Sequence, residues 1–304
     1  MPSIDIALES VIKKIHSKDR FLSLEVSPKL SAKIEESTIN ELREFYNIDA
    51  FVVTDSPLAR FKPSSILSSL KIQNLLQKPV ICTLSMRDRN SLALCGDILG
   101  VNELGLRAFL TLTGDSFQNS DCKGAKSVFE GNSLKLASII DNLNSGIALN
   151  GKTLKEKVDR IYNFAVINSY ANNEEILINK IDKKLSNHNI DALFTQPVYC
   201  RKSSEFLLET LQRINDKYGT NTALVLGFFP VLSYKTALFL RDKLPGVYIP
   251  NLWVKKLESA SFKGQDEEQK VGLELSLKLF EKLQKVHNKF HLMSNKPSIF
   301  KSFI

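Results

Sequence analysis

The chain has 304 residues, of which 43% are hydrophobic and 24% are charged, and its 41 lysines and arginines against 33 acidic residues give a formal net charge of +8. No uninterrupted apolar run approaches the roughly 18–20 residues of a membrane-spanning helix, and the N-terminus carries Asp5 and Glu9 where a signal peptide has its apolar core. The basic residues form no block of the kind that binds nucleic acid, so we expect a cytoplasmic protein with no nucleic-acid or membrane partner.

Short apolar strands alternate with longer helical segments along the chain. An amphipathic helix at about 4–16 comes first. Strands are then expected at 21–26, 50–54, 80–85, 108–113, 164–168, 192–196, 223–228 and 289–293. Helices are expected between them, near 32–45, 64–77, 91–104, 132–143, 174–187, 203–216, 234–243 and 265–286.

The fold class follows from this alternation. Nearly continuous apolar strands are typical of parallel strands covered on both faces. A doubly wound sheet would alternate in the same way, but eight regular units without a linker favour closure into a (β/α)₈ TIM barrel. We predict one domain over 1–304, with an N-terminal helix at 1–18, the barrel at 19–296 and a tail at 297–304. The irregular stretches 114–131 and 144–162 are interpreted as loop insertions.

Polar residues at the carboxyl ends of the strands are the candidate site, because barrel proteins carry their chemistry there. Glu25 lies inside FLSLEVSPK, where a buried acid must be paired, hydrogen-bonded or protonated. Apolar surroundings raise a carboxyl pKa and allow it to act as a general acid near neutral pH. A salt bridge to a neighbouring lysine or arginine is the structural alternative.

Two further residues stand at strand ends. Asp115 in LTLTGD follows a glycine that lets backbone approach a ligand, although it could equally cap a turn. Gln196 in LFTQPVY offers one donor and one acceptor to an amide or heterocycle edge, or to backbone groups of the barrel rim. The other polar residues at these ends are Thr54, Asp55, Ser85, Arg87, Asp88, Thr113, Asn168 and Tyr234.

The segment 146–153, GIALNGKT, matches the phosphate-binding pattern G-x₄-G-K-[ST]. A true phosphate loop follows a buried strand, whereas the residues before this one have helical spacing. A polar loop is therefore the preferred interpretation, and an NTPase is a remote alternative. The four cysteines form no close pair and the four histidines have no metal-ligand spacing, so we expect no metal.

Five segments, in order, resemble motifs of the methylenetetrahydrofolate reductase family of flavin-dependent barrels. They are FLSLEVSPK at 21–29, MRDRNSLALCGDILGVNELGLRAFLTLTGD at 86–115, LFTQPVY at 193–199, GFFPVLSYK at 227–235 and VYIPNLWVKKL at 247–257. Each is weak alone, but together they cover nearly the whole chain in the family's order.

The resemblance implies that NADH or NADPH reduces a bound FAD, which then reduces 5,10-methylenetetrahydrofolate to 5-methyltetrahydrofolate for one-carbon metabolism and methionine supply. It implies Glu25 as the general acid and Asp115 beside flavin and folate, with Gln196 orienting the folate and Tyr234 stacking on it. The family's FAD contacts fall on Thr54, Thr83, Leu112, Thr113, Gly114, Asp115, Asn168 and Lys184.

The departures from the family pattern lie mostly on the flavin side. Thr83 stands where the family has a flavin-binding histidine, Asn168 lacks its flanking glycine and proline, and Lys184 matches only loosely. A folate-binding barrel without its own flavin, or one that acts with a partner subunit for electron transfer, is therefore the alternative. A homo-oligomer is also compatible with the resemblance.

Overall fold

Eight parallel strands form a closed barrel in chain order, in which β1 pairs with both β2 and β8. The computed structural model describes residues 2–304. The strands are β1 (Phe21–Val26), β2 (Ala50–Val53), β3 (Val80–Ser85), β4 (Ala108–Leu112), β5 (Tyr162–Ile167), β6 (Ala192–Pro197), β7 (Ala223–Phe228) and β8 (Lys289–Leu292). The predicted TIM barrel is confirmed, and every strand ends within two residues of its expected position.

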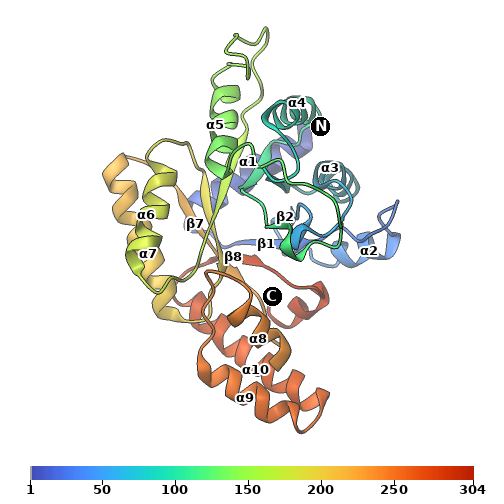
Figure 1. Ribbon diagram of the computed structural model, residues 1–304, viewed down its shortest axis with the longest axis vertical. Helices are drawn as coiled ribbons and strands as arrows, with labels where there is room; N and C mark the ends of the chain where they lie inside the picture. The colour runs from blue at the N-terminus through green and yellow to red at the C-terminus, as the bar shows by residue number, and fades with distance from the viewer. Residues whose placement is uncertain (1) are drawn as a thin grey trace.

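The helices surround the strands as an outer layer (Figure 1). They are α1 (Pro2–His16), α2 (Glu36–Arg43), α3 (Ser65–Leu76), α4 (Ser91–Glu103), α5 (Ser133–Asn144), α6 (Glu174–Leu185), α7 (Arg201–Tyr218), α8 (Tyr234–Asp242), α9 (Asn251–Ser261) and α10 (Gln265–Gln284). Short 3₁₀ turns occur as η1 (Pro57–Ala59), η2 (Phe117–Asn119) and η3 (Pro297–Ser302). Side chains of Ser64, Asn90, Asn132, Asn173 and Ser233 cap helix N-termini, which fixes where those helices begin.

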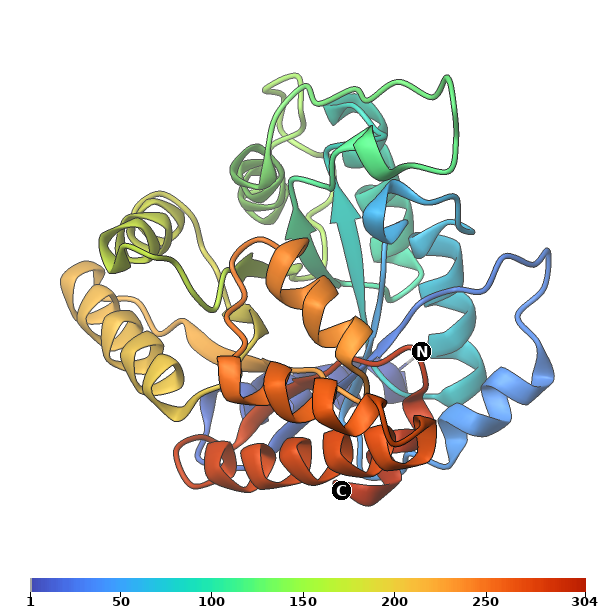
Figure 2. The same cartoon turned by 60° about the horizontal axis from the view of Figure 1, so that its bottom comes forward.

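Helix α9 is an addition to the predicted elements. It packs between α8 and α10, and the three helices lie side by side in orange to red in Figure 2. Its buried residues Trp253, Val254 and Leu257 have helical spacing. Pro250 occupies its N-cap position without a capping side-chain hydrogen bond, so the usual start signal is missing. Helix α2 is shorter than the expected 32–45, because it begins only at Glu36.

The hydrophobic core has two layers. One lies between strands and helices, and the other fills the barrel interior with Phe21, Val52, Phe164 and Phe194 among others. Leu8, Val11 and Ile15 of α1 belong to the interior cluster, so α1 closes the amino-terminal end of the barrel. This packing leaves the opposite end, where the strands finish, for a ligand.

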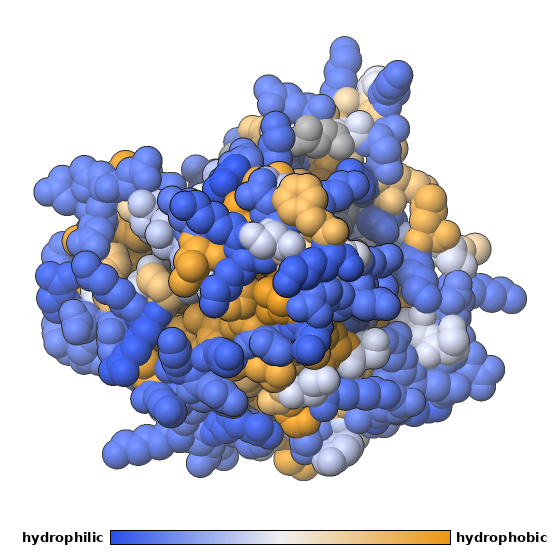
Figure 3. Space-filling model, turned by 90° about the horizontal axis from the view of Figure 1, so that it is seen from below, coloured by the Kyte–Doolittle hydropathy of each residue, from blue (hydrophilic) through white to orange (hydrophobic). Residues whose placement is uncertain are grey.

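The face seen from below in Figure 3 is mostly hydrophilic, with hydrophobic areas near its centre and at its upper right. Within residues 2–304, no helix combines the length and the apolar character needed to cross a membrane.

The segment 146–153 does not form a phosphate loop. It follows α5, a helix, and Ile147 and Thr153 pair across it in an antiparallel bridge. No helix begins between this bridge and β5. The remote NTPase alternative is therefore wrong, because the strand–loop–helix geometry that cradles phosphate is absent from this segment.

Candidate functional site

A cavity of about 250 Å³ opens into the barrel at the carboxyl ends of the strands. Its lining residues come from seven of the eight strands or the loops that follow them, with β7 as the exception, and from Leu244 just after α8. Seven of the residues that the family resemblance implies line it together: Glu25, Thr54, Thr83, Leu112, Gly114, Asp115 and Gln196. The remaining lining residues are Val52, Asp55, Pro57, Leu58, Ser85, Arg87, Leu110, Val166, Phe194, Thr195, Leu244, His291 and Met293.

Glu25 has no lysine or arginine partner in residues 2–304, so the salt bridge considered from the sequence is not formed. Its nearest ionisable neighbour is His291 of β8, whose Nε2 lies 3.8 Å from Oε2 of Glu25. The other imidazole nitrogen, Nδ1, is 3.0 Å from the Ser23 hydroxyl, which the strand register places opposite His291. When Ser23 donates to Nδ1, Nε2 carries the hydrogen and faces the carboxylate. Ser23, His291 and Glu25 together can therefore hold a proton and pass it from one side chain to the next.

His291 was not identified from the sequence. It is 4% exposed and lies within the predicted eighth strand. The available signal was a polar side chain between the apolar Phe290 and Leu292, whereas the spacing of the histidines showed only that they form no metal-binding motif. Residues 2–304 contain no group of three or more metal-binding side chains placed to hold an ion.

Gln196 and Thr54 present polar groups that have no hydrogen-bond partner among residues 2–304. The Gln196 side-chain amide makes no hydrogen bond within the described part of the chain, and it lines the cavity. Thr54 Oγ1 is buried without a hydrogen-bond partner. Because buried polar groups are nearly always paired, the Thr54 hydroxyl indicates a polar ligand in this cavity, and the half-buried Gln196 amide can bind the same ligand.

Asp115 fastens one loop to another. Its Oδ2 accepts a hydrogen bond of 2.6 Å from the Leu58 amide. One carboxylate oxygen therefore holds a loop in place, which is close to the turn-capping role considered from the sequence. Leu58 and its neighbours Ser56 and Ala59 have φ values of 57°, 44° and 55°, in the left-handed region. Such backbone is strained unless its surroundings hold it. The loop after β4 therefore shapes the cavity wall that the loop after β2 provides.

Arg87 and Gly114 complete that wall. The buried Arg87 guanidinium pairs with Asp88 at 2.5 Å and donates to the Ser56 carbonyl at 3.1 Å. Burial opposes its charge, but the hydrogen bond and charge of Asp88 outweigh burial and raise the pKa of Arg87. Gly114 has φ +100°, and a Cβ there would lie 2.6 Å from Cβ of Arg87. Only glycine fits this position.

Four predicted residues lie outside the cavity lining. Thr113 Oγ1 accepts a hydrogen bond from the Ser133 amide at 3.2 Å, and Lys184 donates to the Ser133 hydroxyl at 3.1 Å, so both meet at the start of α5. Asn168 lines a separate open hollow beside Tyr170 and Tyr248. The Tyr234 hydroxyl donates to Glu258 at 3.0 Å.

Burial, and secondarily the charge of Lys180, lowers the pKa of Lys184 to about 8. A partly buried ammonium group whose hydrogen-bond partner is a neutral hydroxyl favours an anion as a further partner.

The fold and the cavity define a (β/α)₈ barrel whose ligand site lies at the carboxyl ends of the strands, with an acid on β1 and an amide on β6. The family model described as methylenetetrahydrofolate reductase matches residues 10–300, and the chain belongs to this family.

Solved structures support the fold. A protein from Clostridium thermocellum, described as uncharacterized and as binding two copies of 5-methyl-5,6,7,8-tetrahydrofolic acid, is 13% identical over 95% of this chain and 94% of its own, with a TM-score of 0.61. EDTA monooxygenase (EmoA) from Chelativorans sp. BNC1 is 11% identical over 93% of this chain and 91% of its own, with a TM-score of 0.55. No curated protein matches the chain.

Proposed function

We propose that this protein is an oxidoreductase that binds a reduced folate in the cavity and reduces 5,10-methylenetetrahydrofolate to 5-methyltetrahydrofolate. NADH or NADPH would donate the electrons through FAD. The observation that carries the proposal is the pair of Glu25 and Gln196, which face one cavity and whose side chains have no hydrogen-bond partner in the described part of the chain. Family membership and the folate named for the Clostridium thermocellum protein support it.

The residues present fit FAD in two places. Thr54, Thr83, Leu112 and Gly114 would hold the flavin ring, and the unpaired Thr54 hydroxyl would bond to its polar edge. Lys184 and the amide end of α5 would face the diphosphate, because a helix N-terminus and an ammonium group both favour an anion. When bound, FAD supplies the hydride for the reduction, while the protein supplies binding, orientation and a proton.

The chain's own residues then have distinct tasks. Protonated Glu25 would donate a proton to the folate ring nitrogen, which opens the five-membered ring, and the carboxylate left behind would face His291. Gln196 would use one donor and one acceptor to orient the pterin edge. Leu112, Val166 and Phe194 form an apolar wall that excludes water around the reacting carbon.

A folate-binding barrel without its own flavin is the second candidate, and the cavity's size favours it. A volume of about 250 Å³ lies below the roughly 300–1,000 Å³ of pockets for drug-sized ligands. It suits one ring system better than two stacked rings. In this candidate a partner subunit would carry the electrons.

Absorbance spectroscopy of the purified protein, with and without added FAD, distinguishes these candidates. The reductase binds FAD, NADH or NADPH bleaches the flavin absorbance, and methylenetetrahydrofolate restores it. Binding of methyltetrahydrofolate without any binding of FAD selects the second candidate. A protein that binds neither FAD nor folate contradicts both.

A further inference from the structure

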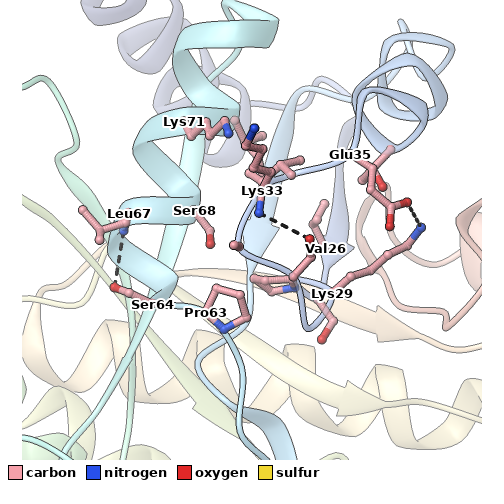
Figure 4. A pocket seen from close by; sticks show the side chains of 16 residues that line it. Val26, Lys29, Lys33, Glu35, Pro63, Ser64, Leu67, Ser68 and Lys71 are labelled. Carbon is pink, nitrogen blue, oxygen red and sulfur yellow. Dashed lines mark hydrogen bonds and ion pairs between the residues drawn. The ribbon is translucent and has the colours of Figure 1, made fainter.

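A second cavity, of about 210 Å³, lies on the outer side of β1. Its walls come from the loop after β1, from α2 and from α3, and Figure 4 shows that loop and α3 on facing sides of the space. Val26, Ile34 and Ile72 are among its apolar lining residues. It shares no lining residue with the cavity of Glu25, so it is a separate site on this surface.

Two hydroxyl groups line this cavity from different helices. Thr38 Oγ1 on α2 is buried and has no hydrogen-bond partner among residues 2–304. Ser68 on α3 lines the cavity, and its hydroxyl makes no hydrogen bond to another residue in that range. Buried hydroxyls normally find a partner, so the unpaired Thr38 hydroxyl points to an acceptor that the protein itself does not supply, and the Ser68 hydroxyl can donate to the same acceptor.

The charge around the cavity is positive. Lys29 is balanced by Glu35, whose carboxylate lies 3.1 Å from its ammonium group. Lys33 and Lys71 also line the cavity, and neither forms an ion pair with another described residue. An acceptor that carries negative charge would satisfy the hydroxyls and the two ammonium groups together, because charge-assisted hydrogen bonds are stronger than neutral ones.

We propose that this cavity binds a small organic anion, namely a carboxylate attached to a single apolar ring or a short branched chain. The apolar walls would cover the body, while Thr38, Ser68, Lys33 and Lys71 would face the carboxylate. The volume of about 210 Å³ is smaller than pockets for drug-sized ligands, which limits the body to one ring. This inference does not depend on the proposed reaction.

Benzoate is the probe, and benzamide is its uncharged control of the same shape. Benzoate is expected to shift the methyl resonances of Val26, Ile34 and Ile72 in two-dimensional NMR spectra, with those of Leu58 and Leu112 in the barrel cavity unmoved. Benzamide should bind at least about tenfold more weakly, because it lacks the charge that the lysines recognise.

The variant K33Q/K71Q removes both ammonium groups at exposed positions and should weaken benzoate binding at least about tenfold. The matched control K256Q/K263Q makes the same change of net charge on α9 and just after it, and should leave binding unchanged. The proposal is wrong if benzoate does not bind, if both double variants weaken it equally, or if it shifts only the barrel methyls.

Discussion

Glu25 is the residue on which the proposed reaction depends. Its carboxyl group faces the cavity, no lysine or arginine of the described residues pairs with it, and His291 is its ionisable neighbour at 3.8 Å. Glu25→Gln keeps the shape but removes the proton that opens the folate ring. We expect reduction of the flavin by NADH to continue, whereas folate reduction falls at least about 10²-fold. Stopped-flow absorbance measures the two half-reactions separately.

Glu103→Gln, on the exposed side of α4, is the matched control and should alter neither half-reaction. Equal loss of both half-reactions in Glu25→Gln would show that the acid is structural.

Gly114 is the position where backbone geometry limits the choice of residue. Alanine there combines a φ of +100° with a contact of 2.6 Å to Cβ of Arg87. We expect Gly114→Ala to lower the free energy of unfolding by about 1–3 kcal/mol and to weaken ligand binding, because the wall formed with Arg87 must move. Urea unfolding measures the first effect, and ligand titration measures the second.

Gly124→Ala separates strain from the clash. Gly124 has a similar φ of +95°, but nothing lies within 4 Å of an added Cβ. A loss of stability as large as that of Gly114→Ala would mean that the left-handed backbone, and not the contact with Arg87, determines the cost.

The candidate residues at strand ends lie in the cavity more often than those on helices, such as Tyr234 and Lys184. Glu25 and Gln196 face the cavity because they end strands whose bounds follow from apolar runs. Tyr234 begins a helix, and its hydroxyl is held by Glu258, 24 residues along the chain. A hydrogen bond between residues so far apart in the chain cannot be predicted from the sequence around Tyr234. His291 was missed for a similar reason. Its strand was predicted, but its hydrogen bond with Ser23 forms only because β8 pairs with β1 when the barrel closes.

Among the elements, strands were predicted more accurately than helices, and α9 explains why. An uninterrupted apolar run predicts a buried strand from the sequence alone. In α9, by contrast, apolar residues are mixed with Lys255, Lys256 and Glu258, and no side chain caps its N-terminus. Packing against α8 and α10 stabilises α9, and this contribution cannot be predicted from its local sequence.

That packing is testable with two leucines of α9. Leu257 is fully buried, whereas Leu252 is 60% exposed. Leu257→Ala should lower the free energy of unfolding by about 2–5 kcal/mol, because it opens a cavity between the helices. Leu252→Ala should change it by less than about 0.5 kcal/mol. Similar effects of the two substitutions in urea unfolding would contradict the assignment of Leu257 to the core.

For the whole molecule, the net charge of +8 does not gather in the barrel cavity. The cavity lining contains three carboxylates, of Glu25, Asp55 and Asp115, against the single guanidinium of Arg87. Arg87 is itself paired with Asp88. Anionic parts of the proposed cofactor would therefore meet positive charge elsewhere, and Lys184 of α6, whose ammonium group lies at the start of α5, is a cation placed to receive one.

Lys184 makes stability depend on pH in a direction that can be measured. Burial lowers its pKa to about 8 in the folded protein, from 10.5 when exposed. Between these values the unfolded chain binds more protons, so stability rises with pH through this window and is lost as pH falls toward 8. Lys184→Met removes the buried charge, and we expect the free energy of unfolding at pH 7 to increase by about 1–3 kcal/mol.

The control is Lys183→Met, which removes an exposed neighbouring charge and should leave the pH dependence unchanged. A diphosphate beside Lys184 would stabilise its charged form, so added FAD should flatten the pH dependence of the wild type between pH 8 and 10.5 but not that of Lys184→Met. Urea unfolding at several pH values measures both effects. If Lys184→Met is less stable than the wild type at pH 7, the ammonium group is satisfied by the protein alone and has no need of an anion.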